Sequence, residues 1–578
     1  GLALFLYGME AMGAGLSKLS GGRMERLLEK LTSKRIMAVL LGAGVTAVIQ
    51  SSSATTVMVV GFVNSGIMKL NQAVGIIMGA NIGTTITSWL LSLTGIQGSS
   101  FILKMLKPSS FSPILAIVGI IFIMFTKDEK KKDIGGIFLG FAILMYGMEA
   151  MSGAVAPLAD NEKFTGILTM FSNPILGLLA GTILTAVIQS SSASVGILQA
   201  LCATGAVNFS TALPIIMGQN IGTCITAILS AIGAKKNAKR AAAVHLYFNL
   251  IGTVIFMTVF YLINAVVGFS FFHQAATPAG IAVIHSVFNV TATIILLPFA
   301  KGLEKLACLT IRDKKEDVVV SAEDREFMIL EPRFLEKPAF AVEQSRNAAR
   351  KMAEESHNAL FTALSLVDKY SEEGVERVEN MESKVDRYED ELGTYLVKLS
   401  HKDISEADSH SLSIMLHCIG DFERISDHAV NIMESAQELY EKGLKFSENA
   451  KKDLEVLGQA VEDIVNTAYE VFDKQDMKLA EKIEPLEEVI DELSKEVKRR
   501  HVQRLRNGEC TIEMGFILSD ITTCLERVAD HCSNIGVCVT QVNEDLYDTH
   551  SHLNIVKSHP DETFYHELED ARIKYQLS

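Results

Sequence analysis

Cysteine is scarce in this chain, and the signatures of common enzyme classes are missing. The eight cysteines among 578 residues are scattered, and no two form a Cys-x-x-Cys pair. This argues against a disulfide framework and against a zinc site. There is also no nucleophile-elbow serine, no phosphate-binding P-loop and no protein-kinase signature. We therefore expect a protein that is not an enzyme.

A uniform charge is also lacking. The net charge of −15 combines two halves of opposite sign. Up to Lys305 there are 20 Lys and Arg against 10 Asp and Glu, so the totals of 53 and 68 leave 33 and 58 for the remainder. An acidic protein of this kind is a poor binder of nucleic acid, which requires a basic face. The division instead fits an apolar part followed by a water-soluble part.

The first 305 residues contain apolar stretches long enough to cross a bilayer. Examples are residues 111–126, 134–156, 241–264 and 281–300. The sequences TAVIQSSSA, YGMEAM and MG(A/Q)NIGT each occur twice, always at an offset of 139 residues. We therefore predict an all-α, polytopic membrane domain, with repeat 1 at 1–133, repeat 2 at 134–270 and a final transmembrane segment at 271–305.

Basic loop residues predict how the repeats lie in the membrane. The loop after the first apolar segment has five basic residues from Arg23 to Arg35, whereas the equivalent loop, 157–174, has only Lys163. Because basic loops stay in the cytoplasm, the two loops should face opposite sides if each QSSS segment is a re-entrant hairpin. Inverted repeats with broken helices are a transporter architecture. We expect a multi-pass protein of the inner or plasma membrane, with the chain after residue 305 in the cytoplasm.

Four polar motifs interrupt the apolar segments: QSSS at 50–53 and 189–192, and NIGT at 81–84 and 220–223. Non-helical backbone at membrane depth persists only where it lines a cavity or is buried in protein. We expect a helix break at QSSS and, through glycine, backbone freedom at NIGT. Such oxygens suit a hard cation such as sodium, and helix N-termini suit an oxyanion. The alternative is close helix packing by Ser and Thr, which repetition in register disfavours.

The paired QSSS and NIGT motifs resemble those of the type II sodium–phosphate cotransporters and their bacterial relatives. The resemblance covers nearly all of residues 1–305 and implies that phosphate and sodium bind between the two hairpins, near the membrane centre. The binding residues that it implies are Gln50, Ser51, Ser52, Ser53, Thr55, Asn81 and Thr84, with Gln189, Ser190, Ser191, Ser192, Asn220 and Thr223. Cys224 stands where repeat 1 has Thr85, so the two halves are not chemically identical.

The QSSS and NIGT motifs contain neither lysine nor arginine. Phosphate is costly to desolvate, and helix ends supply only partial charge, so bound cations are the expected compensation. The function expected is a sodium-coupled phosphate symporter, with phosphate, Na⁺ and membrane lipid as partners and a homodimer as one option. The alternatives are a membrane-tethered phosphate sensor, a transporter of another oxyanion such as arsenate, and a protein that exports its substrate.

Two histidines are further candidates within the membrane half. His245 and His285 each precede a Phe-Asn pair, in AVHLYFN and AVIHSVFN. An ionisable residue inside a membrane is a functional candidate, and a proton relay is conceivable. The interpretation that we favour is a neutral hydrogen-bonding role between helices.

The chain changes character after residue 305. Residues 306–340 are expected to be a linker, 341–545 a cytoplasmic domain of long amphipathic helices, and 546–578 a polar, loosely ordered tail. ERISDHAVNI at 423–432 matches ERVADHCSNI at 526–535 at an offset of 103. This pattern resembles PhoU-like domains, which are pairs of three-helix bundles associated with phosphate regulation.

Carboxylates spaced along these helices are candidate metal ligands. Residues four apart share a helix face, and the resemblance implies that a metal cluster is an option. The candidates are Glu382, Asp386, Glu423, Asp427, Glu484, Glu488, Glu526 and Asp530, with His428 or His531 nearby. The alternative is a solvated acidic face braced by Arg424 and Arg527 at helical spacing.

Overall fold

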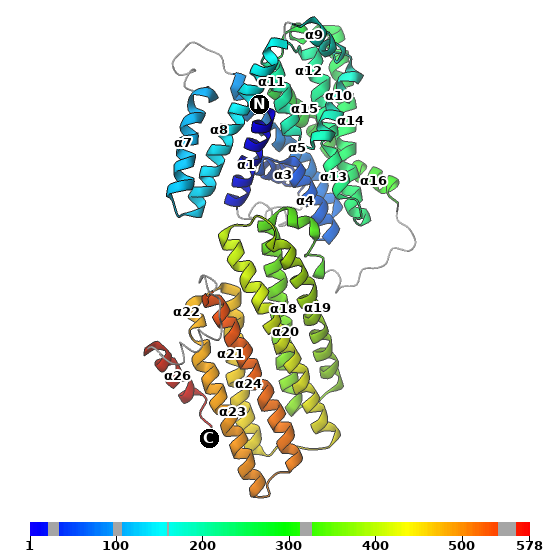
Figure 1. Ribbon diagram of the computed structural model, residues 1–578. Helices are drawn as coiled ribbons and strands as arrows, with labels where there is room; N and C mark the ends of the chain where they lie inside the picture. The colour runs from blue at the N-terminus through cyan, green and yellow to red at the C-terminus, as the bar shows by residue number, and fades with distance from the viewer. Residues whose placement is uncertain (21–33, 96–106, 159–160, 313–325, 542–561, 578) are drawn as a thin grey trace. The chain divides into compact units, whose positions relative to one another are not determined.

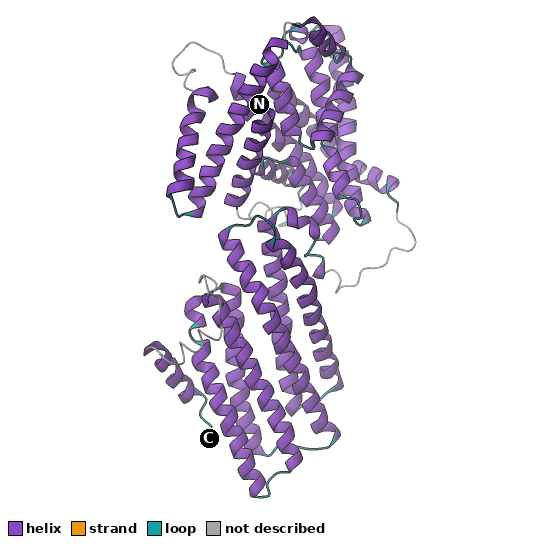
Figure 2. Ribbon diagram, viewed as in Figure 1, coloured by secondary structure: helices purple, strands orange, loops and turns teal. Residues whose placement is uncertain are grey.

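A computed structural model describes residues 1–578 except 21–33, 96–106, 159–160, 313–325, 542–561 and 578 (Figure 1). All regular elements in these described ranges are helices (Figure 2), and one isolated bridge joins Asn208 to Ala275. The chain divides into two compact units, Gly1–Phe340 and Ala341–Ser578. The predicted all-α fold class is therefore confirmed.

The first unit contains both repeats. Repeat 1 comprises α1 (Leu2–Ser20), α3 (Arg35–Ile49), α4 (Ser52–Ser65), α5 (Leu70–Ser92) and α7 (Pro108–Phe125). Next come α8 (Glu129–Val155), α9 (Glu162–Met170), α10 (Pro174–Ile188), α11 (Ser191–Cys202), α12 (Phe209–Gly222), α13 (Cys224–Ser230) and α14 (Lys236–Val267). The unit then adds α15 (Pro278–Leu296) and α16 (Ala300–Thr310).

Helix lengths separate membrane-spanning segments from hairpins. Among the described residues, five helical segments are long and apolar enough to cross a membrane: Leu70–Gly95, Lys130–Val155, Phe209–Ser230, Lys236–Val267 and Pro278–Thr310. By contrast, α3 and α10 have 15 residues each, fewer than the roughly 20 that a crossing needs. Their length fits the predicted re-entrant hairpins.

Helices α1 and α8, which carry the repeated YGMEAM sequence, pack against each other in antiparallel orientation. A Cβ atom at Gly8 would lie 2.3 Å from the backbone nitrogen of Leu144, and one at Gly147 would lie 2.3 Å from that of Phe5. The offset of 139 residues converts the first contact into the second. Equivalent helices that meet through such self-complementary contacts are related by a two-fold axis. The predicted inverted repeats are thereby confirmed.

Each repeat packs the first helix of its hairpin against the helix that carries NIGT. A Cβ atom at Gly79 of α5 would lie 2.0 Å from the carbonyl oxygen of Val39, and one at Gly218 of α12 would lie 2.0 Å from that of Leu178. Only glycine permits this approach at either position. The same contact in both repeats places each NIGT motif beside the hairpin of its own repeat. Around them, α14 packs against α4, α5 and α13, and α15 packs against α5.

The end of the predicted linker is packed onto the first unit. The short helix η5 (Pro332–Glu336) brings Phe334, which is fully buried, to within 5.3 Å of Phe62 on α4, measured between ring centroids. Asn64 Nδ2 donates to Glu331 Oε2 at 2.7 Å, and Arg333 Nε donates to the carbonyl oxygen of Ser230 at 2.6 Å. Residues 306–340 are thus not simply a spacer, because buried aromatic rings and charged hydrogen bonds attach their last part to α4 and the turn after α13.

The second unit is built from two groups of three long helices. The first group is α18 (Pro338–Asp368), α19 (Glu372–Ser400) and α20 (Glu406–Glu441). The second is α21 (Glu448–Lys474), α23 (Ile483–Arg506) and α24 (Ile512–Gln541), with the short α22 (Met477–Ala480) between α21 and α23. Helices α20 and α24 carry the second sequence repeat and pack together. Ring centroids of the equivalent His428 and His531 lie 5.8 Å apart, so the two copies of this sequence repeat are also in contact with each other.

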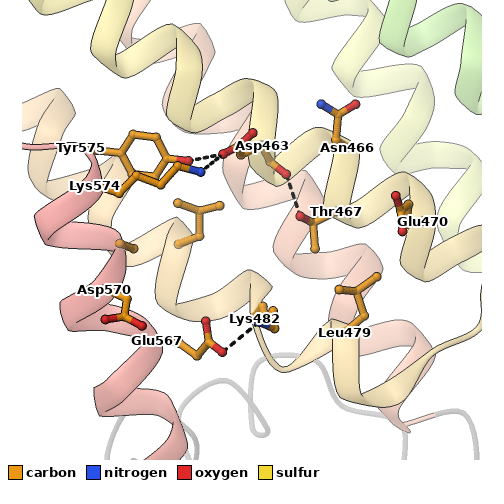
Figure 3. A pocket seen from close by; sticks show the side chains of 12 residues that line it. Asp463, Asn466, Thr467, Glu470, Leu479, Lys482, Glu567, Asp570, Lys574 and Tyr575 are labelled. Carbon is orange, nitrogen blue, oxygen red and sulfur yellow. Dashed lines mark hydrogen bonds and ion pairs between the residues drawn. The ribbon is translucent and has the colours of Figure 1, made fainter.

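The last helix contradicts the expectation of a loosely ordered tail. Residues 546–561 lie outside the described part of the chain, but α26 (Glu562–Lys574) packs on α23. Lys574 and Tyr575 both donate to the carboxylate of Asp463, beside a pocket of about 350 Å³ (Figure 3). Tyr575 is 4% exposed. A buried ring and ion pairs hold this polar segment, and composition alone did not reveal them.

Candidate functional site

The two QSSS segments form helix breaks of the same geometry. Gln50 ends α3 and Gln189 ends α10, and both have a left-handed backbone with φ of 59°. The next residue caps the following helix, since Ser51 Oγ accepts from Ala54 N and Ser190 Oγ accepts from Ala193 N, each at 3.2 Å. The predicted helix break at QSSS is therefore present in both repeats.

The tips of the two hairpins meet. Ser53 Oγ donates to the carbonyl oxygen of Gln189 at 3.3 Å. The N-termini of α4 and α11 and the C-termini of α3 and α10 are therefore close to one another. Helix N-termini attract anions and helix C-termini attract cations. This junction therefore brings helix ends of both polarities together.

Several predicted ligands keep hydroxyls available at this junction. Within the described residues, no hydrogen bond engages the hydroxyl groups of Ser52, Ser191 or Ser192, all of which are buried. Thr55 differs, because its Oγ1 donates to the carbonyl oxygen of Ser51 at 3.1 Å and accepts from Thr46 Oγ1. Thr55 therefore links α3 to α4 through its hydroxyl group and is a weaker candidate ligand than the three serines.

The NIGT motif of repeat 1 does not free its backbone, and there the prediction was wrong, because α5 continues through Asn81–Thr84. In repeat 2, α12 ends at Gly222 and α13 begins at Cys224, and Thr223 between them keeps helical backbone angles (φ −59°, ψ −27°). The hydroxyl of Thr84 donates to the carbonyl oxygen of Ala80, and that of Thr223 to Gln219. The glycine is needed for packing instead, since a Cβ atom at Gly83 would lie 2.5 Å from the carbonyl oxygen of Ala43.

Asn81 is held by a buried polar network that includes residues of α14. Its Nδ2 donates to Asn249 Oδ1 at 2.8 Å, and its Oδ1 lies 3.4 Å from His245 Nε2. Asn249 in turn donates to Cys224 Sγ at 3.3 Å. These contacts support the hydrogen-bonding interpretation of His245. The sequence did not identify Asn249 as a partner, although its place four residues after His245, repeated as Asn289 after His285, was a usable signal.

The electrostatics of the site come from dipoles rather than from charged side chains. Apart from Arg35 at the start of α3, the helices α3, α4, α5, α10, α11 and α12 contain no Asp, Glu, Lys or Arg. Gln50 is buried and accepts from Thr87 Oγ1 at 2.8 Å, whereas Gln189 is exposed. Asn220 Nδ2 donates to the carbonyl oxygen of Ile216. Any ion bound here is balanced by another ion or by partial charges.

In the second unit the predicted carboxylates gather in two acidic sets. Burial, followed by Asp386 and Asp427, raises the pKa of Glu382, and burial and Asp427 raise that of Glu423. Arg424 pairs with Asp427, and at the equivalent position Arg527 pairs with Asp530, both at 3.1 Å. In the second set, Ser533 donates to Glu484 and Lys498 pairs with Glu526. These ion pairs are the bracing that the alternative to metal binding requires.

No metal-binding arrangement is evident in the described part of the chain. No group of three or more His, Cys, Asp and Glu side chains there is disposed to hold a metal ion. Neither Glu488 nor the other carboxylates can be assigned a metal on this geometry. Metal binding by the second unit stays a prediction.

Two inverted hairpins with meeting tips define a transporter-type membrane protein. The family model of the Na⁺/Pi-cotransporter matches residues 4–153 and 143–276, and that of the PhoU domain matches 349–436 and 454–539. The chain therefore belongs to the Na⁺/Pi-cotransporter family and carries a PhoU domain. Both families are of the transport or regulatory type, not enzymes.

Individual relatives and one solved structure show how far the similarity extends along the chain. The Escherichia coli protein YjbB, named as an inorganic phosphate export protein, is 24% identical over 94% of this chain and 97% of its own length. The rat sodium-dependent phosphate transport protein 2A is 37% identical over 20% of this chain and 18% of its own length. The crystal structure of PhoU from Pseudomonas aeruginosa aligns with 35% of this chain and 95% of that chain, at 20% identity and a TM-score of 0.33.

Proposed function

We propose that this protein is a sodium-coupled symporter of inorganic phosphate whose PhoU domain is cytoplasmic and regulates transport. The observation that supports it most directly is the hydrogen bond from Ser53 Oγ to the carbonyl oxygen of Gln189, which joins the hairpin tips. Phosphate would bind at the N-termini of α4 and α11, with the hydroxyls of Ser52, Ser191 and Ser192 as donors.

Sodium coupling follows from charge. A phosphate ion carries one or two negative charges that the helix termini compensate only in part, and no Lys or Arg lies in the helices of the site beyond Arg35. Sodium bound at the C-terminal carbonyl groups of α10 would contribute the missing positive charge. The two ligands should then bind with reciprocal coupling.

The direction of transport has two candidates. A relative is named for phosphate export and another for sodium-dependent phosphate transport, and inverted repeats permit access from both sides. We favour inward symport, because an inward sodium gradient would drive phosphate in the same direction. Phosphate sensing without transport, and transport of arsenate, are the remaining alternatives.

Uptake of labelled phosphate into proteoliposomes tests the proposal. Purified full-length protein should accumulate phosphate when sodium is outside and choline inside, and unlabelled arsenate measures selectivity for the oxyanion. Vesicles loaded with labelled phosphate test export under the same gradients. Equal rates in sodium and choline would exclude sodium coupling, and the absence of flux in either direction would favour a sensor.

A further inference from the structure

The two hairpins share the sequence TAVIQSSSA but bond their hydroxyl groups differently. In the first hairpin Thr46 Oγ1 donates to Thr55 Oγ1 at 3.0 Å, which joins α3 to α4. The equivalent pair in the second hairpin is Thr185 and Ser194. Both side chains are fully buried, and neither hydroxyl has a hydrogen-bond partner within the described residues. The hairpins are therefore chemically different one turn away from the tip.

Two unpaired hydroxyls at one position of a hairpin need a common explanation. Burying a hydroxyl without a partner is unfavourable, and here it occurs on both α10 and α11, which pack together. Serine at 194 also has one methyl group fewer than threonine at 55. The second hairpin thus has two unpaired oxygens where the first has a closed hydrogen bond.

The helix C-terminus beside this pair offers a further oxygen. In the first hairpin the side chain of Gln50 donates through Nε2 to the carbonyl oxygen of Ala47 and so caps α3. In the second hairpin Gln189 is exposed, and within the described residues its side chain makes no corresponding bond to the carbonyl group of Ala186. Uncapped carbonyl groups at the end of a half-helix coordinate cations in membrane transporters.

We propose that the second hairpin binds a monovalent cation of the size of sodium between Thr185 Oγ1, Ser194 Oγ and the carbonyl oxygen of Ala186. Hydroxyl and carbonyl oxygens are ligands that hard cations prefer. The first hairpin does not bind a cation at the equivalent place, because Thr46 and Thr55 satisfy each other. This assignment deepens the proposed sodium coupling by giving one ion a place in repeat 2 only.

Sodium-dependent thermal stability tests the site without relying on transport. The full-length protein in detergent is melted in increasing NaCl, with choline chloride keeping the ionic strength constant and no phosphate present. A ligand that binds the folded state raises the melting temperature. Thr185→Val and Ser194→Ala should raise the sodium concentration needed for this effect by about tenfold, the loss expected for one contact to an ion.

Thr46→Val is the matched control, because it removes the same atoms at the equivalent position. It should lower the melting temperature in choline by breaking the Thr46–Thr55 bond and leave the sodium dependence unchanged. Thr185→Val should not lower the melting temperature in choline, since it removes an unpaired hydroxyl.

Two results would overturn the site: an unchanged sodium dependence in both repeat 2 variants, or no sodium effect on the wild-type protein. An unchanged sodium dependence would mean that the hydroxyl groups of Thr185 and Ser194 bind water or only pack against their neighbours. Proteoliposome uptake is scored separately. If uptake depends on sodium but Thr185→Val leaves the sodium dependence of melting unaltered, this site is disproved and symport is not. If sodium raises the melting temperature but uptake is not coupled to sodium, symport is disproved and the site is not.

Discussion

Gln50 and Gln189 share one backbone conformation, with φ of 59° at both, yet their side chains lie in different surroundings. Gln50 is 8% exposed and accepts a hydrogen bond from Thr87, which belongs to α5 of the same repeat. The side chain of Gln189 is exposed, and its backbone carbonyl oxygen accepts a hydrogen bond from Ser53 Oγ of the other repeat. The glutamine of the duplicated motif therefore stabilises its own repeat in the first copy, whereas its side-chain amide is accessible in the second.

Alanine substitutions should separate these roles. Gln50→Ala removes a buried hydrogen bond, which stabilises the protein by about 1 kcal/mol, so its melting temperature should fall. Gln189→Ala should leave the melting temperature unchanged and raise the sodium concentration needed for half-maximal phosphate uptake. Melting curves and sodium titrations on both variants provide the comparison. Equal destabilisation by the two substitutions would contradict the asymmetry.

Serine substitutions test the phosphate site. Ser52→Ala and Ser191→Ala each remove a donor at a helix N-terminus that lacks cationic side chains. A hydrogen bond to a charged group is worth about 1.5–3 kcal/mol, so phosphate affinity should fall about tenfold or more in each variant. Calorimetric titration of phosphate in sodium buffer measures this. Ser65→Ala, whose hydroxyl donates to the carbonyl oxygen of Phe62 at the far end of α4, is the control and should retain wild-type affinity.

The inverted repeats and the helix breaks were predictable because duplication is written directly in the sequence. The offset of 139 residues pairs Tyr7 with Tyr146, and the structure packs α1 against α8 accordingly. The polar run at QSSS suggested a helix break, which is present, but the left-handed conformation of Gln50 and Gln189 was not predicted. The repeated spacing of His245–Asn249 and His285–Asn289 marks these residues in the sequence, but it does not show that the first pair contacts Asn81, which lies 164 or more positions away.

Two other features escaped prediction for a physical reason. The NIGT glycines suggested backbone freedom, but whether glycine serves flexibility or close packing depends on the neighbouring helix. Similarly, the composition of residues 562–577 is that of a solvated tail, and partners on α21 and α23, among them Asp463 and Glu492, hold α26 in place. Single-sequence patterns report local preference and do not report which distant surface is available.

Membrane sidedness is a prediction that labelling can check. The basic residues between Arg23 and Lys34 lie mostly outside the described residues, and their positive charge predicts that this loop is cytoplasmic. Single cysteines at Lys34 and Ser172, in a chain whose Cys308 and Cys510 are replaced by serine, should react with an impermeant maleimide from opposite sides. Reaction of both from the same side would contradict opposite placement of the two loops.

Truncation tests both the transport unit and its attached segment. A chain ending at Phe340 should bind phosphate with wild-type affinity, because every proposed ligand precedes residue 224. A chain ending at Arg312 additionally loses Phe334 and Phe340, whose rings cover Phe62. Each fully buried phenylalanine contributes about 1.5–3 kcal/mol, so the shorter chain should melt at a lower temperature. Identical melting of both truncations would show that the segment adds no stability.

Glu382→Gln tests whether the acidic set on α19 and α20 is a braced face or a metal site. Burial, Asp386 and Asp427 raise the pKa of Glu382 above its usual value of 4.5. A raised pKa means that the protonated form is favoured in the folded state. The stability that this provides is present below pH 4.5 and is lost as the pH rises through the folded pKa. At neutral pH the substitution should therefore raise the melting temperature of the full-length protein, and below pH 4.5 the difference should disappear. Glu376→Gln, at an exposed carboxylate on the same helix, is the control and should change little at either pH.

If the set instead binds a divalent cation, added Mn²⁺ or Mg²⁺ would stabilise the wild-type protein, and Glu382→Gln would abolish that stabilisation.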